Sequence, residues 1–95
     1  MTGEGRRYLT DRGIESVPPR DGAYSAPKEQ RERQRVVEPS DPIPVRVWIE
    51  ARQSGNHECD AHAIGWTDRQ VHVRYVDIHG REGWTWVWAN AVTRR

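Results

Sequence analysis

Apolar and polar residues alternate through most of the chain after residue 42, with the period of two that is typical of half-buried β-strands. The alternation runs over residues 45–50, 58–66, 71–76 and 84–88, and a short last strand is expected at 92–94. In the first of these ranges the aliphatic residues are expected to face inward and Trp48 outward. Five short strands joined by polar turns within the last 53 residues predict an all-β fold, a small five-stranded antiparallel barrel over residues 43–95.

Turn-forming residues separate the predicted strands. Ser54-Gly55 lies between the first two strands, and residues 67–70 form a polar turn before the third. Three residues, Asp77, Gly80 and Gly83, are expected to mark the turn between the third and fourth strands. Residues 89–91 predict a single 3₁₀ turn before the last strand.

Residues 1–42 lack this pattern. Eight basic and eight acidic residues balance over residues 1–41, few aliphatic side chains are present, and prolines recur at the end of the segment. Such a segment buries too little apolar surface to offset the entropy of ordering its backbone. We therefore predict a disordered arm and proline-rich linker over residues 1–42. One local exception is a short helix over residues 26–36, capped by Ser25, which is expected to be marginal in water.

The run A-H-A-I-G-W-x4-V-H-V-R-Y-V-D-x2-G-x6-V-x4-V-T-R-R, from Ala61 to Arg95, resembles the Tudor-type Src-homology-3-like barrel. The likeness is one of pattern and covers roughly residues 45–95. It implies a non-catalytic binding module with a small-residue second strand and a 3₁₀ turn before the last strand. Several Tudor-type domains hold methylated lysine or arginine in an aromatic cage around the first and third turns. At those turns this chain has His57, His79 and Trp84.

Five tryptophans in so small a domain exceed what its core can use. Val87 matches an inward position of the resembled pattern, which leaves Trp86 and Trp88 on the outer face of the fourth strand. Tryptophan and arginine dominate the energetics of protein interfaces. The candidate binding residues are therefore the exposed tryptophans and the arginines beside them: Trp48, Trp84, Trp86, Trp88, Arg46 and Arg74.

Three interpretations of this surface remain open. The first is a protein-interaction domain that uses the tryptophan and arginine face. The second is a nucleic-acid-binding barrel, in which the aromatics stack on bases and Arg46, Arg74 and Arg94 contact phosphates. The third is a stand-alone structural protein in which tryptophans pack on one another, on arginine side chains or under the linker.

Other classes of function find little support in the sequence. The spacing of His57, Cys59 and His62 lacks a fourth ligand, and Cys59 and His62 are expected on opposite faces of a strand, so no metal or other cofactor is expected. No nucleophile, base and orienting group occur together, so we expect no enzyme and no small-molecule substrate. The net charge of +1 is unlike that of a typical nucleic-acid binder.

The cellular setting is inferred from composition. No apolar run is long enough to cross a membrane, and the N-terminus lacks the apolar stretch of a secretion signal. The single cysteine cannot form an internal disulfide, which favours a reducing cytoplasm. The use of arginine in place of lysine at all basic positions but Lys28 favours a GC-rich genome.

Overall fold

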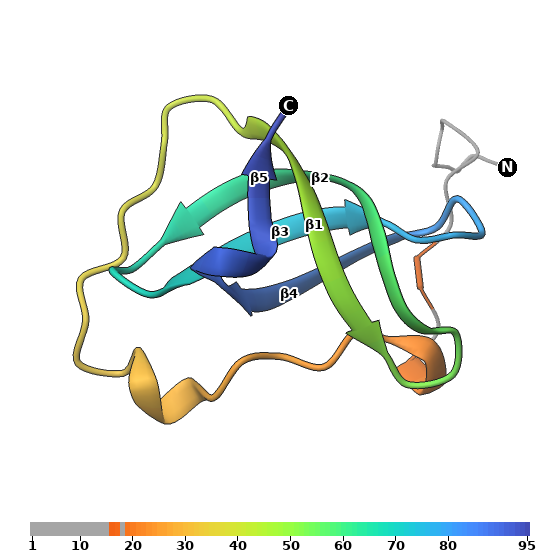
Figure 1. Cartoon of the computed structure of the whole chain (residues 1–95). Coiled ribbons are helices and arrows are strands. Elements are labelled where there is room, and N and C mark those ends of the chain that lie inside the picture. Colours follow the sequence, from red (N-terminus) through yellow and green to blue (C-terminus); the bar gives the residue numbers. More distant parts are fainter. Residues whose placement is uncertain (1–15, 18) are drawn as a thin grey trace, which may run out of the picture.

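The computed structural model describes residues 16, 17 and 19–95, and it is an all-β fold. Five antiparallel strands form one sheet in the order β4-β3-β2-β1-β5 (Figure 1). The strands are β1 (Ile43–Ala51), β2 (Gly55–Trp66), β3 (Gln70–Val76), β4 (Glu82–Trp88) and β5 (Val92–Arg94). Three 3₁₀ turns complete the described elements: η1 (Pro19–Asp21), η2 (Lys28–Gln30) and η3 (Ala89–Ala91). The predicted strands, the 3₁₀ turn at 89–91 and the short last strand are confirmed.

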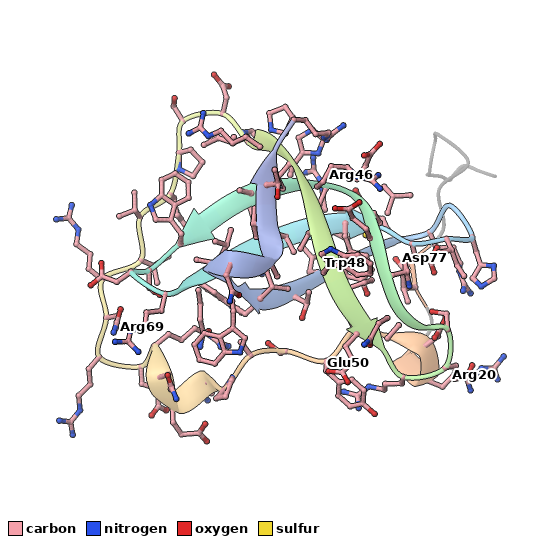
Figure 2. The ribbon with its side chains drawn as sticks, in the orientation of Figure 1. Arg20, Arg46, Trp48, Glu50, Arg69 and Asp77 are labelled. Atoms are coloured by element: carbon pink, nitrogen blue, oxygen red, sulfur yellow. The ribbon has the colours of Figure 1, made fainter. Side chains whose placement is uncertain are left out.

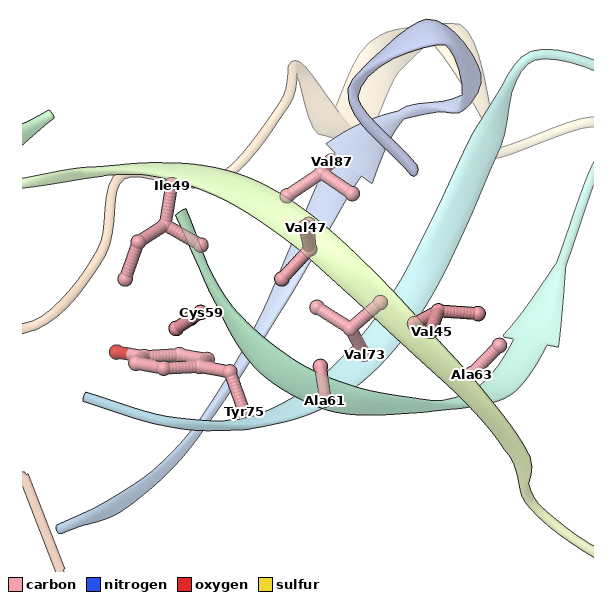
Figure 3. Packing of buried hydrophobic residues seen from close by; sticks show 9 residues of the cluster. All are labelled: Val45, Val47, Ile49, Cys59, Ala61, Ala63, Val73, Tyr75 and Val87. Atoms are coloured by element: carbon pink, nitrogen blue, oxygen red, sulfur yellow. The ribbon is translucent and has the colours of Figure 1, made fainter. Parts of the chain in front are cut away.

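The inner face of the sheet carries the residues that alternation assigned to it. Figure 3 shows β1 passing over the other strands, so that Val47 lies between Val87 of β4 and Val73 of β3. The largest fully buried side chains include Tyr75, Val47 and Val73. The core is aliphatic with one aromatic ring, and its buried members are Val45, Val47, Ile49, Cys59, Ala61, Ala63, Val73, Tyr75 and Val87. This packing confirms the inward face predicted for β1 and the inward position predicted for Val87 of β4.

The strand order leaves β4 and β5 as the two edges of the sheet. β5 pairs with the first half of β1, from Val45 to Val47, while the second half of β1 continues beyond it. The backbone pairing therefore shows one five-stranded sheet with two edges, and closure into a barrel stays a prediction.

Three predicted turn residues belong to strands: Gly55 and Gln70 are the first residues of β2 and β3, and Gly83 lies inside β4. Gly80 occupies the β3–β4 turn with a left-handed φ of +78°, as glycine allows. Gly83, by contrast, is a buried residue of β4, directly opposite Tyr75 in the β3–β4 pairing. A Cβ atom at Gly83 would come within 2.6 Å of the Tyr75 ring. Glycine is needed there because the phenol ring crosses the backbone, not because the chain turns.

The segment that precedes the sheet follows a defined path from residue 19 onward. In Figure 1 it runs from the C-terminal end of β1, past β4, and back to the start of β1. The expected helix over 26–36 is reduced to the single 3₁₀ turn η2. Residues 1–42 were predicted to be disordered, but residues 19–42 follow this defined path. Residues 1–15 and 18 of the predicted arm lie outside the described residues. Hydrogen bonds between this segment and the sheet account for the difference.

Candidate interaction surface

The tryptophans of β1 and β4 point away from the core, as predicted, but to different degrees. Trp48 is 56% exposed, Trp84 is 52% exposed and Trp88 is 37% exposed, whereas Trp86 is half-buried. Figure 2 shows Arg46, Trp48 and Glu50 following one another along β1. The predicted set of tryptophans is therefore outward-facing but unevenly covered.

Trp86 is covered by the segment before the sheet. Its indole stacks on His72 of the neighbouring strand, with ring centroids 4.8 Å apart and planes 6° from parallel. The guanidinium carbon of Arg31 lies 4.5 Å from the centroid of the Trp86 ring. Arg31 also donates hydrogen bonds of 3.0 Å to the Ala26 carbonyl and 3.1 Å to Oε1 of Gln70. Burial, followed by the positive charge of Arg31, lowers the pKa of His72, while Glu38 opposes this shift.

Trp48 and Trp88 line a single groove that the sequence did not predict. Its volume is about 210 Å³, and Tyr24 stands at its rim, 49% exposed. The guanidinium of Arg52 lies 4.5 Å from the centroid of the Tyr24 ring. The lining comes from the N-terminal segment, β1, β4 and η3: Tyr24, Ser25, Ala26, Pro27, Trp48, Ile49, Glu50, Val87, Trp88 and Ala91. The structure thus brings Trp48 and Trp88 together and places Trp86 under Arg31, apart from them.

The N-terminal segment lies between β4 and the second half of β1. The Tyr24 N–H donates to the Glu50 carbonyl on β1, and the Ala26 N–H donates to the Trp86 carbonyl on β4, both at 2.8 Å. Further along β4, the Val17 N–H donates to the Glu82 carbonyl at 2.8 Å. These bonds occupy backbone groups on the exposed edge of β4, which would otherwise be open to pairing with another chain.

Three buried polar side chains of the sheet find partners in the same segment. Gln70 is fully buried, and its Nε2 donates to the Pro27 carbonyl at 3.1 Å. The hydroxyl of Tyr75, which is 1% exposed, accepts a hydrogen bond of 3.1 Å from the Ala23 N–H. Thr85 Oγ1 donates to the Tyr24 carbonyl at 3.1 Å. Because buried polar groups must be hydrogen-bonded, these three make the segment part of the fold.

The arginines predicted for the surface are paired with carboxylates. Arg46 donates to Asp60 at 2.8 Å and to Glu58 at 3.2 Å, which raises its pKa. Arg74 lies 3.2 Å from the carboxylate of Glu82. Arg94 is exposed on the short strand β5. Two of these three guanidiniums therefore have their charge balanced on the protein itself.

The end of the sheet where an aromatic cage was considered is polar. A cavity of about 510 Å³ there is lined by Arg20, Asp21, Gln53, Ser54, His79 and Arg81. Asp21 accepts hydrogen bonds from the N–H groups of Ser54 and Gln53 at 2.7 and 2.9 Å, and the bond from Ser54 is the main reason that its pKa is lowered. Arg81 lies 3.2 Å from the carboxylate of Asp77 and 3.6 Å from that of Asp21. Trp84 lies outside this lining, so the residues at these turns form an ionic cluster instead of a cage.

The residues considered as metal ligands lie apart. Cys59 is in the core, where burial raises the pKa of its thiol to about 11, and His62 is on the outer face of β2, as expected. Over residues 16, 17 and 19–95, no group of three histidine, cysteine or acidic side chains is placed to hold a metal ion. Within the same part of the chain, no helix is long and apolar enough to cross a membrane.

Sequence reasoning missed the residues that hold the N-terminal segment. Tyr24, Arg31 and Gln70 fell in ranges predicted as disorder or turn, and each acts through a partner more than 30 residues away. The signals available in the sequence were an aromatic residue, Tyr24, and an arginine, Arg31, within an otherwise polar segment. Comparison of the chain with protein families, with curated proteins and with solved structures finds no match.

Proposed function

We propose that the chain is a non-catalytic binding module that contacts a protein partner through the rim of the Trp48–Trp88 groove. The observation that carries this proposal is the exposure of large aromatic side chains beside a complete core. Trp48, Trp88 and Tyr24 line one groove and remain between 37% and 56% exposed. Contiguous exposed aromatics are typical of protein-interaction sites, where tryptophan and tyrosine supply most of the binding free energy.

The two other interpretations receive less support. Contact with nucleic acid through Arg46 and Arg74 would have to break their ion pairs with Asp60, Glu58 and Glu82. Internal covering accounts for Trp86, which lies under Arg31, but it leaves Trp48 and Trp84 more than half exposed. Protein binding at the groove accounts for Trp48, whereas Trp84 lies outside the groove lining.

A capture experiment with matched variants tests the proposal. The full chain is immobilised as wild type, as Trp48→Ser and as Ile78→Ser, and proteins retained from an extract of the producing cells are quantified. Ile78 is a suitable control because it is 57% exposed, close to the 56% of Trp48, and lies in the β3–β4 turn. We expect Trp48→Ser to lose a partner that wild type and Ile78→Ser both retain.

Two further measurements define the outcome. All three proteins should melt within a few degrees of one another, since exposed substitutions usually change stability by less than about 0.5 kcal/mol. Capture should also persist as salt is raised, because an apolar contact is screened far less than a phosphate contact. Equal capture by Trp48→Ser and wild type would exclude the groove as the binding site.

A further inference from the structure

The slot between β4 and the second half of β1 recognises the sequence of the segment that fills it. Its backbone bonds to Tyr24 and Ala26 require an extended chain, since both neighbouring strands are contacted at once. Its side-chain contacts are more selective. Gln70 binds the Pro27 carbonyl through Nε2 and the Arg31 guanidinium through Oε1, and Trp86 lies under that guanidinium. An occupant of the slot must therefore carry an arginine at a fixed distance after an extended stretch.

The connection that follows the segment is lightly attached. Between Arg31 and Ile43, the described contacts to the sheet include one backbone bridge, in which Val37 and Trp66 exchange hydrogen bonds of 2.8 and 2.9 Å. Most side chains of residues 32–42 are exposed. Eleven extended residues span up to about 38 Å, which exceeds the 31 Å middle dimension of the molecule. The segment can therefore reach the slot of an adjacent molecule while its own sheet stays intact.

We propose that the slot also accepts residues 22–31 of a second copy of this chain, so that two molecules exchange these segments reciprocally. The exchange keeps every contact in the slot. The equilibrium between monomer and dimer therefore depends on protein concentration and on the connecting residues 32–42. A second copy has the same sequence, so it carries Arg31 at the required distance after the extended stretch. A foreign peptide would have to match both the arginine and this distance. Tyr24 to Pro27 of the segment also line the Trp48–Trp88 groove, and in the exchanged dimer the same residues of the second copy take their place. The exchange is detected by the contact between Arg31 and Trp86, and the proposed function is detected by Trp48 on β1, so the two can fail independently.

The wild-type chain provides the first test. Isotope-labelled and unlabelled chains are mixed in denaturant and refolded together at about 1 mM, the order of the effective concentration that a short connection provides. Filtered nuclear Overhauser spectra then report contacts between Arg31 of one chain and Trp86 of another, and light scattering reports mass. We expect this interchain contact, with a dimer fraction that rises with concentration. A single-chain mass at every concentration, or a dimer that lacks the Arg31–Trp86 contact, overturns the proposal.

Complementary variants provide the second test. Ala26→Pro removes the N–H that bonds to Trp86 but leaves the slot intact, and Trp86→Ala damages the slot but leaves the segment intact. We expect a mixture of the two to form heterodimers. The control replaces the second chain by one that carries both substitutions and offers no competent segment.

The result remains interpretable when Ala26→Pro does not fold alone. Folding that is recovered on addition of the Trp86→Ala chain, and not with the control chain, supports exchange. A mixture that behaves as the sum of its separate components contradicts it.

Discussion

At the scale of single residues, the close contact between Gly83 and Tyr75 leaves no room for a side chain at position 83. Gly83→Ala would place a Cβ atom 2.6 Å from the phenol ring, and overpacking of this kind costs about 1–3 kcal/mol. Gly65→Ala is the matched control, because its Cβ atom would meet no atom closer than 3.4 Å. Chemical denaturation should show a clear loss for Gly83→Ala and little change for Gly65→Ala. Equal stability of the two variants would mean that the ring can move away.

His72 gives the second prediction at this scale. Its pKa in the folded protein lies below the ordinary value of 6.5, because it is half-buried beside Trp86 and near Arg31. The unfolded chain therefore binds the proton more readily, and stability is fully present above about pH 6.5 and is lost as the pH falls through the folded pKa. The pKa of His62 is lowered too, so it contributes with the same sign.

Melting temperatures measured between about pH 7.5 and pH 5 test this dependence. They should fall more steeply for wild type than for His72→Gln. His79→Gln, in the exposed β3–β4 turn, is the control and should keep the wild-type slope. An unchanged slope in His72→Gln would remove His72 as the cause.

At the scale of elements, the N-terminal segment is held at a few points, and hydrogen exchange should reveal them individually. The N–H groups of Val17, Tyr24, Ala26 and Val37 donate to carbonyls of β2, β1 and β4. We expect these amides to exchange more slowly than those in the exposed stretch 32–36. Uniformly fast exchange from residue 19 to 42 would support the disorder that the sequence predicted.

The contact of Arg31 with the Trp86 ring also belongs to the N-terminal segment. Arg31→Ala removes a cation–π contact, worth about 1 kcal/mol, and leaves Gln70 Oε1 without its donor. Arg33→Ala is the control, because Arg33 is exposed two residues away. Denaturation followed by tryptophan fluorescence should show a loss of stability for Arg31→Ala alone. Equal denaturation curves for the two variants would show that the contacts of Arg31 add nothing measurable to the stability of the fold.

The strands of the sheet could be predicted from sequence, and the N-terminal segment could not, for one physical reason. Alternation is a local property, so Val45, Val47 and Ile49 indicate their buried face without reference to other strands. The segment from Ala23 to Arg31 buries little apolar surface of its own. It is ordered instead by hydrogen bonds to Tyr75, Thr85 and Gln70, whose positions depend on the whole sheet. The outward direction of Trp48 was predictable, but its pairing with Trp88 in a groove required the segment.

At the scale of the whole molecule, the sheet and the segment should behave as one cooperative unit. Deletion of residues 1–42 removes the hydrogen-bond partners of Gln70, Tyr75 and Thr85, each bond being worth about 0.5–1.5 kcal/mol net, and exposes the surface that the segment covers. Since a domain this small has little stability to spare, we expect residues 43–95 to lose cooperative unfolding or to melt far below the full chain. Tryptophan fluorescence should shift to the red as Trp86 becomes exposed. A truncated chain that melts within a few degrees of the full chain would contradict this prediction.

The order in which the chain is synthesised has a consequence for how this fold is completed. Tyr24 and Thr85, which are joined by a hydrogen bond, are 61 residues apart, and the segment needs both β1 and β4 before it can bind. At about 5–20 residues per second, translation from one to the other takes roughly 3–12 s. During that interval Tyr24 and Ala26 lack their partners on β4. The segment is therefore synthesised before the two strands that hold it and can bind only after both are made, so a nascent chain that stops before β4 exposes the segment to other molecules.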